Sequence, residues 1–205
     1  MTVEVTPAAE ADLTELADVA ARTFPLACPP STGADDVAAF IAEHLSAERF
    51  GEYLADPERV ILTARDDHRI SGYAMLIRGV VPDPDVQRAV PLRPAVELSK
   101  MYVLPDAHGA GVSAALMTTA LDTSRALGAA CVWLGVNQEN QRAQRFYAKH
   151  GFAVSGTKTF RLGGHIENDY VMVHALIAHP RPSAPTDATS RAGTSCGTHP
   201  PTSPR

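Results

Sequence analysis

The most constraining feature of this sequence is a predicted strand, loop and helix with two glycines in the loop. The strand is predicted over residues 98–104, and Pro105 ends it because proline cannot donate to a strand ladder. Gly109 and Gly111 follow, and they let the backbone turn tightly and approach a ligand closely. The helix predicted over 112–127 directs its unpaired N–H groups and its positive dipole end at this loop. The segment therefore predicts an anion site made of backbone, suited to phosphate.

Two known phosphate-binding loops do not fit this segment. A dinucleotide-binding turn needs a third glycine, but Ser113 and Ala114 stand there. A P-loop needs Gly-Lys-Ser/Thr, which is absent. A pair of glycines is also common in ordinary tight turns. The loop thus indicates phosphate binding without either of those folds.

A second informative segment follows directly. A buried strand is predicted over 130–136 and a helix over 140–150, which Gly151 ends. Asn140, Ala143 and Tyr147 are three and four residues apart, so they share one stripe of that helix. The amide could bind an elongated ligand, the alanine could admit it closely, and the phenol could reach its reactive end. The alternative is that this stripe only packs against the sheet.

The rest of the chain gives the fold class. Further strands are predicted at 3–5, 60–64, 70–81, 152–160 and 170–175, and further helices at 13–24, 37–45 and 50–54, with a proline-rich loop over 82–94. We therefore expect an α/β (α+β) fold, with helices packed on a mixed, mostly antiparallel sheet of about seven strands. One domain is expected over residues 1–179. Residues 180–205, rich in Pro, Ser and Thr, are expected to form a disordered tail.

Composition excludes several functions. The net charge is −5 and no basic run appears, so nucleic-acid binding is not expected. No apolar stretch reaches the roughly 20 residues of a membrane span, and no signal peptide is visible, so a cytoplasmic protein is expected. Cys28, Cys131 and Cys196 are widely separated and match neither a disulfide framework nor a zinc pattern, so no metal is predicted.

Together and in this order, the two segments resemble the GCN5-related N-acetyltransferase (GNAT) superfamily. Its loop pattern, Gln/Arg-x-x-Gly-x-Gly/Ala, falls on His108, Gly111 and Ser113. Its helix pattern falls on Asn140, Ala143, Tyr147, Gly151 and Phe152. The segments 21–54, 97–103 and 157–176 are similar to the PaiA-type polyamine acetyltransferases. The resemblance implies a GNAT fold and acetyl-CoA as the cofactor.

The resemblance also implies a role for each matching residue. Backbone amides of the loop would hold the pyrophosphate, from His108, Gly109, Ala110, Gly111, Val112 and Ser113. The strand residues Met101, Tyr102 and Val103 would pair with the pantetheine arm and the acetyl carbonyl. Asn140 and Ala143 would line the pantetheine arm, and Tyr147 would protonate the departing thiolate. His108 and Ser113 depart from the family pattern. This departure would lower the affinity for acetyl-CoA only if binding needs the usual side chains.

The expected reaction is attack of a free amine on the thioester, which creates an oxyanion that the Val103 amide could stabilise. Tyr147 is the predicted catalytic acid and Glu97 the predicted base, although Glu97 could equally be an exposed or ion-paired carboxylate. The predicted acceptor is a small polyamine- or drug-like amine, capped by residues 24–54. A protein lysine or N-terminal acetyltransferase and a non-catalytic CoA sensor are the alternatives. The protein is expected to be a monomer or a homodimer, with residues 170–175 as a possible edge strand.

Overall fold

The computed structural model describes residues 3–28, 32–66, 68–109, 111–162 and 165–176, and of residues 160–162 and 165 it describes the backbone. The strands in this part of the chain are β1 Glu4–Pro7, β2 Arg59–Asp66, β3 Arg69–Arg78, β4 Ala95–Val103, β5 Cys131–Asn137, β6 Ala153–Leu162 and β7 His165–Ala175. The helices are α1 Leu13–Thr23, α2 Ala34–His44, α3 Ala47–Ala55, α4 Pro84–Ala89, α5 Val112–Ala126 and α6 Gln141–Lys149. The tail predicted over 180–205 lies outside the described residues.

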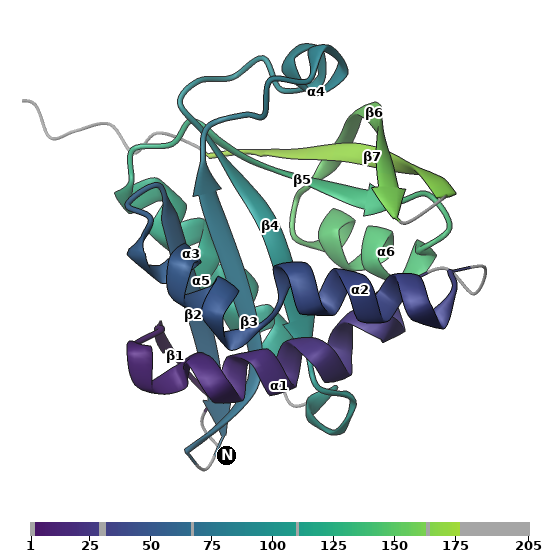
Figure 1. The fold of residues 1–205 in the computed structure, drawn as a ribbon. Coiled ribbons are helices and arrows are strands. Elements are labelled where there is room, and N and C mark those ends of the chain that lie inside the picture. The colour runs from purple at the N-terminus through teal and green to yellow at the C-terminus, as the bar shows by residue number, and fades with distance from the viewer. Residues whose placement is uncertain (1–2, 29–31, 67, 110, 163–164, 177–205) are drawn as a thin grey trace, which may run out of the picture.

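All seven strands form one sheet in the order β1-β2-β3-β4-β5-β7-β6 (Figure 1). Every neighbouring pair is antiparallel except β4 and β5. This confirms the predicted mixed, mostly antiparallel sheet. The prediction of residues 170–175 as an edge was wrong, because β7 lies between β5 and β6. The edges are β1 and β6.

The parallel pair β4 and β5 is short, and this creates the main feature of the fold. Its ladder runs only from Ala95 opposite Cys131 to Glu97 opposite Trp133. Beyond Glu97 the two strands separate, so that β5 and β7 turn away from β4 (Figure 1). A register shift in the β3–β4 ladder leaves Ser99 as an extra residue at this point, which is a β-bulge. The sheet therefore opens into a wedge.

Helices cover both faces of the sheet (Figure 1). α5 packs on one face, where Leu116, Met117 and Ala120 are fully buried with residues of β2 to β5. α1 and α3 pack on the other, where Leu16 and Phe50 are fully buried with Tyr73 of β3. α2 lies beside them. No described helix is long and apolar enough to cross a bilayer.

The loop predicted over 82–94 contains the short helix α4, so that prediction was wrong in part. Asp83 caps this helix, because its carboxylate accepts from the backbone N–H groups of Asp85 and Val86 at 2.8 and 3.2 Å. Proline is well tolerated in the first helical turn, where Pro84 stands. α4 packs against β6, where the Ser155 hydroxyl donates to the Ala89 carbonyl at 2.6 Å.

Candidate functional site

The free edge of β4 forms one wall of the wedge. The Leu104 N–H donates to the Ser71 carbonyl of the β3 strand at 2.8 Å. Backbone groups of successive strand residues face opposite edges, so those of Met101 and Val103 face the side of β5. The β4–β5 ladder has already ended there, at Glu97. Met101 and Val103 therefore present backbone hydrogen-bonding groups to the wedge, whereas those of Tyr102 face β3.

The glycine loop opens at one end of this wedge. Gly109 and Gly111 have φ values of +87° and +82°, a backbone conformation that strongly favours glycine. A Cβ built at either position meets nothing within 4 Å. Val112 begins α5 with its side chain buried, and Ser113 lines the adjacent cavity. Ala110 lies outside the described residues.

His108 connects this loop to α6. Its Nδ1 lies 3.1 Å from an Arg142 guanidinium nitrogen, and its Nε2 lies 3.1 Å from the Val103 carbonyl oxygen. Arginine can only donate, so Nδ1 accepts and Nε2 carries the proton that it donates to Val103. These two contacts link the end of β4, the loop and α6. They also place a guanidinium beside the loop, which the sequence patterns did not single out, although Arg142 stands in the first turn of the predicted helix.

Two cavities share the wedge. The smaller, about 210 Å³, lies beside the loop and includes Val103, His108, Ser113 and Arg142 in its lining. The larger, about 320 Å³, lies beside α2 and the segment that follows α1, and it includes Phe24, Cys28, Phe40 and Leu45 in its lining. Six residues line both cavities and are shared between them: Ala27, Met101, Tyr102, Asn140, Ala143 and Tyr147. The two cavities therefore have a common wall.

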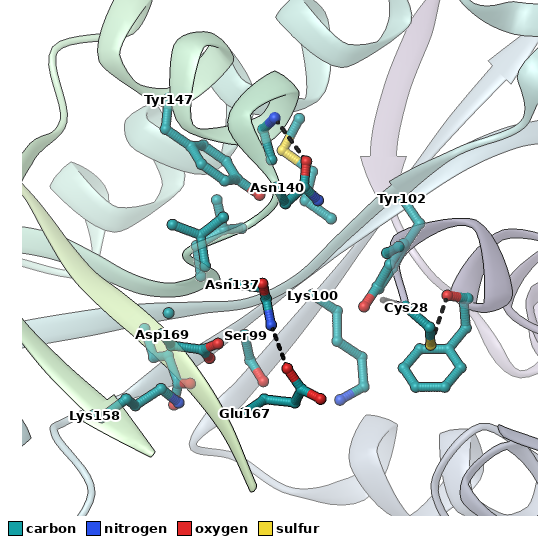
Figure 2. A pocket seen from close by; sticks show the side chains of 18 of the residues that line it. Cys28, Ser99, Lys100, Tyr102, Asn137, Asn140, Tyr147, Lys158, Glu167 and Asp169 are labelled. Atoms are coloured by element: carbon teal, nitrogen blue, oxygen red, sulfur yellow. Dashed lines mark hydrogen bonds between the residues drawn. The ribbon is translucent and has the colours of Figure 1, made fainter. Parts of the chain in front are cut away.

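The predicted helix stripe lies on that wall. Asn140 is the N-cap of α6, because its side-chain oxygen accepts from the Ala143 N–H at 3.0 Å. Among the described residues its amide nitrogen donates no hydrogen bond, so this group can donate to a ligand. Figure 2 shows Tyr147 extending toward the cavity from α6. Burial raises the pKa of Tyr147 to about 12, so the phenol keeps its proton at neutral pH. Such a group can act as an acid.

The larger cavity collects charged side chains from three strands (Figure 2). Glu97 and Lys100 come from β4, Lys158 from β6, and Glu167 and Asp169 from β7. Burial raises the pKa of the Glu97 and Asp169 carboxyl groups, although nearby Lys158 opposes this effect in both. Burial lowers the pKa of Lys100 to about 8. Both Glu97 and Asp169 can therefore accept a proton more readily than an exposed carboxylate.

Most of this charged set was missed by the sequence patterns. Lys158 and Asp169 lie opposite each other in the β6–β7 ladder, a pairing between strands predicted only from their apolar residues. No local spacing connects either of them to Glu97. Within the described part of the chain, no group of three His, Cys, Asp or Glu side chains could hold a metal ion.

The comparisons with known proteins agree with this geometry. A family model described as the acetyltransferase (GNAT) family matches residues 17–152. That match covers well over half of the chain. The chain belongs to the GNAT acetyltransferase family. It is an acetyl-CoA-dependent N-acetyltransferase, and the wedge, the open glycine loop and the adjoining Arg142 suit an extended phosphate-bearing donor.

Curated relatives and solved structures support this membership. An uncharacterized N-acetyltransferase of Mycobacterium tuberculosis is 60% identical over 166 residues, which are 81% of this chain and 99% of that protein. Among solved structures, the PaiA N-acetyltransferase from Thermoplasma acidophilum in complex with coenzyme A has a TM-score of 0.68 at 19% identity, covering 86% of this chain and 100% of that one. The ribosomal-protein-S18-alanine N-acetyltransferase from Escherichia coli has a TM-score of 0.60 at 18% identity, covering 85% and 94%. These structural likenesses concern the fold.

Proposed function

We propose that this N-acetyltransferase transfers the acetyl group to the primary amine of a small molecule, by direct attack in a ternary complex. The observation that carries the proposal is the common wall of the two cavities, formed in part by Met101 and Tyr147. A donor along the free edge of β4 and an amine in the larger cavity would meet at this wall. Holding two reactants in line supplies most of the catalysis that such a reaction needs.

The aromatic side chains of Phe24 and Phe40, which line the larger cavity, favour a small acceptor. Phe24 stacks on Phe40 of α2 with ring centroids 4.4 Å apart, and both residues line the cavity. About 320 Å³ lies in the range of pockets that take small molecules. A peptide acceptor would need an open groove instead, which argues against the protein-acetylating alternative.

Each group of residues has a separate role in this reaction. Bound acetyl-CoA supplies the activated acetyl thioester. Loop N–H groups from His108 to Ser113 and the Arg142 guanidinium hold the phosphates, and backbone groups of Met101 and Val103 align the pantetheine arm. Tyr147 holds a proton for the departing thiolate, and Glu97 or Asp169 accepts the proton of the amine. Asn140 binds the pantetheine side through its side-chain amide N–H groups.

Thiol release tests the proposal. Purified protein with acetyl-CoA and a panel of small amines and short peptides should release thiol faster with at least one small amine than with any peptide. Preferential turnover of a peptide would reject the small-molecule acceptor. Absence of turnover with every acceptor, together with calorimetric binding of CoA, would instead support the sensor alternative.

A further inference from the structure

Lys158 of the edge strand β6 extends across the sheet into the larger cavity. It lies opposite Asp169 of β7, and Figure 2 shows the two side chains beside each other. β7 separates β6 from β5. A Cβ built at Gly135 of β5 would nevertheless overlap the Lys158 Cε and lie 2.9 Å from its Nζ. The lysine chain therefore crosses β7 and carries its ammonium to β5, where it lines the cavity.

Gly135 makes this position of the ammonium possible. It belongs to the regular ladder between β5 and β7, opposite Val171, so its missing side chain matters here rather than its backbone freedom. A glycine inside a strand often marks a place where another group approaches closely. Here the approaching group is the far end of Lys158. A lysine on an edge strand is common, because its charge discourages pairing with other chains, but this one is directed into the cavity.

Two carboxylates lie near this ammonium. The Cβ built at Gly135 is also 3.2 Å from Asp169 Oδ2, so Lys158 and Asp169 meet above the same residue of β5. The ammonium is 6.0 Å from the centre of the Trp133 ring, and Trp133 is the ladder partner of Glu97. Both carboxylates line the same cavity as the ammonium. Lys158 is thus placed near both candidate bases, which come from two other strands.

The effect of this charge on the two carboxylates agrees with its position. Burial raises the pKa of the Glu97 and Asp169 carboxyl groups, and Lys158 is the strongest charge that opposes the rise in both. A nearby cation favours the ionised form of a carboxyl group. A base must be in that form to accept a proton.

Other charged groups act on one of the two carboxylates each. Lys100 of β4 and Arg59 of β2 also lower the pKa of Glu97. Glu167 of β7 raises the pKa of Asp169. The ammonium from β6, by contrast, acts on both carboxylates.

Resting on the proposed function, we propose that Lys158 is a positioning residue for the base: its ammonium, held over Gly135, keeps the proton-accepting carboxylate ionised beside the incoming amine. The protonated acceptor transfers one proton to this carboxylate, and the free amine then attacks the thioester. Lys158 acts through the carboxylate and not on the reacting atoms.

Lys158→Met tests this role, because it removes the charge and retains most of the chain length. We expect kcat/KM for the best small amine of the thiol-release panel to fall about tenfold at neutral pH, and the acid limb of its pH profile to move to higher pH. The loss should disappear at high pH, where the carboxylate is ionised without the lysine. Lys158→Arg, which keeps the charge, should retain the wild-type profile. An equal loss at every pH would indicate a structural role, and a rise in kcat/KM would show that Lys158 mainly repels the amine; either result would overturn the proposal.

Gly135→Ala displaces the ammonium without removing it. The new methyl group meets the far end of a flexible side chain, so the lysine should move while the Tm stays near that of the wild type. We expect the acid limb to move as in Lys158→Met, and the double variant should show no further change, because both substitutions remove the same interaction. Additive effects of the two changes would refute the placement of Lys158 over this glycine.

A carboxyl-carbon NMR titration measures the same effect without turnover. The Glu97 and Asp169 signals should titrate at higher pH in Lys158→Met than in the wild type. Lys149→Met, at an exposed lysine of α6, is the matched control and should leave both signals and the pH profile unchanged. Unchanged titration in Lys158→Met would overturn the role of this lysine. Turnover of no amine would reject the proposed function, and the titration would still decide whether Lys158 acts on the carboxylates.

Discussion

At the residue scale, Tyr147 is the proposed acid, and it lines both the cavity assigned to the donor and the cavity assigned to the amine. Its pKa of about 12 keeps the phenol protonated. We expect Tyr147→Phe to lower kcat about 100-fold, a usual loss for a general acid, and to leave the Kd of CoA unchanged because the ring remains. Thiol release and calorimetry measure the two quantities. An unchanged kcat would show that the thiolate takes its proton from water.

The identity of the base is the second question at this scale. The sequence predicted Glu97 as the base, from its position on the strand that enters the site. The structure adds Asp169, near Tyr102, as a second candidate base. A base works only when deprotonated. Because burial raises the pKa of both carboxyl groups, the acid limb of kcat/KM should lie at a higher pH than an exposed carboxylate would give.

Glu97→Gln and Asp169→Asn distinguish the two carboxylates. The change at the true base should lower kcat/KM about 100-fold at neutral pH, where the amine is protonated. The loss should shrink as the pH rises toward the pKa of the amine, since a free amine needs no base. The other variant should keep the wild-type pH profile. If both variants retain that profile, neither carboxylate is the base.

At the scale of elements, the N-terminus of α5 depends on one glycine. Gly111 and Gly128 flank α5 with φ values of +82° and +78°, and a Cβ at either site meets nothing within 4 Å. We therefore expect Gly111→Ala and Gly128→Ala to destabilise the protein similarly, by about 1–2 kcal/mol each, through backbone strain. Thermal unfolding measures this loss.

Only Gly111 adjoins the predicted phosphate site, so the two variants should differ in binding. Gly111→Ala should weaken CoA in calorimetry, and Gly111→Val should weaken it further. Gly128→Ala is the matched control and should keep the wild-type Kd. Equal CoA affinity in all three variants would reject the assignment of this loop to the phosphates.

Local patterns predicted elements well where one period continued over many residues. α5 and α6 were predicted to within one residue at each end, and the Pro105 and Gly151 ends agree with the structure. α4 was missed because its six residues form fewer than two helical turns, and the prolines in and around it suggested a loop. The β-bulge at Ser99 was also missed, since a bulge depends on the register of β4 against β3.

At the scale of the whole molecule, one part of the predicted site could be identified from the sequence and the other part could not. The donor side comes from two contiguous segments, so its residues could be named from the sequence. The acceptor side combines the segment after α1 with α2, β4, β5, β6 and β7, which are distant in the chain. Lys100, Lys158 and Asp169 carry no motif, and only the sheet order brings them into one cavity. Their proximity becomes visible only in three dimensions.

The extent of the domain is the last prediction at this scale. Leu176 is the last described buried residue, and its N–H donates to the Ala130 carbonyl at 2.9 Å. The M. tuberculosis relative matches 166 residues with 99% of its own length, so it offers no counterpart to the remainder of this chain. We therefore expect a chain truncated after His179 to match the full chain in Tm, CoA affinity and kcat/KM.

A chain ending at Tyr170 is the contrasting variant. It lacks Val171 and Met172, which are buried between the sheet and its helices, and it leaves most of β5 without its β7 partner. Losing these two side chains alone, apart from the buried Leu176, should cost about 3–6 kcal/mol, a large part of the stability of a domain this size. We expect no cooperative unfolding transition in this variant. A lower Tm or a weaker CoA affinity already after truncation at His179 would show that residues 180–205 contribute to the folded enzyme.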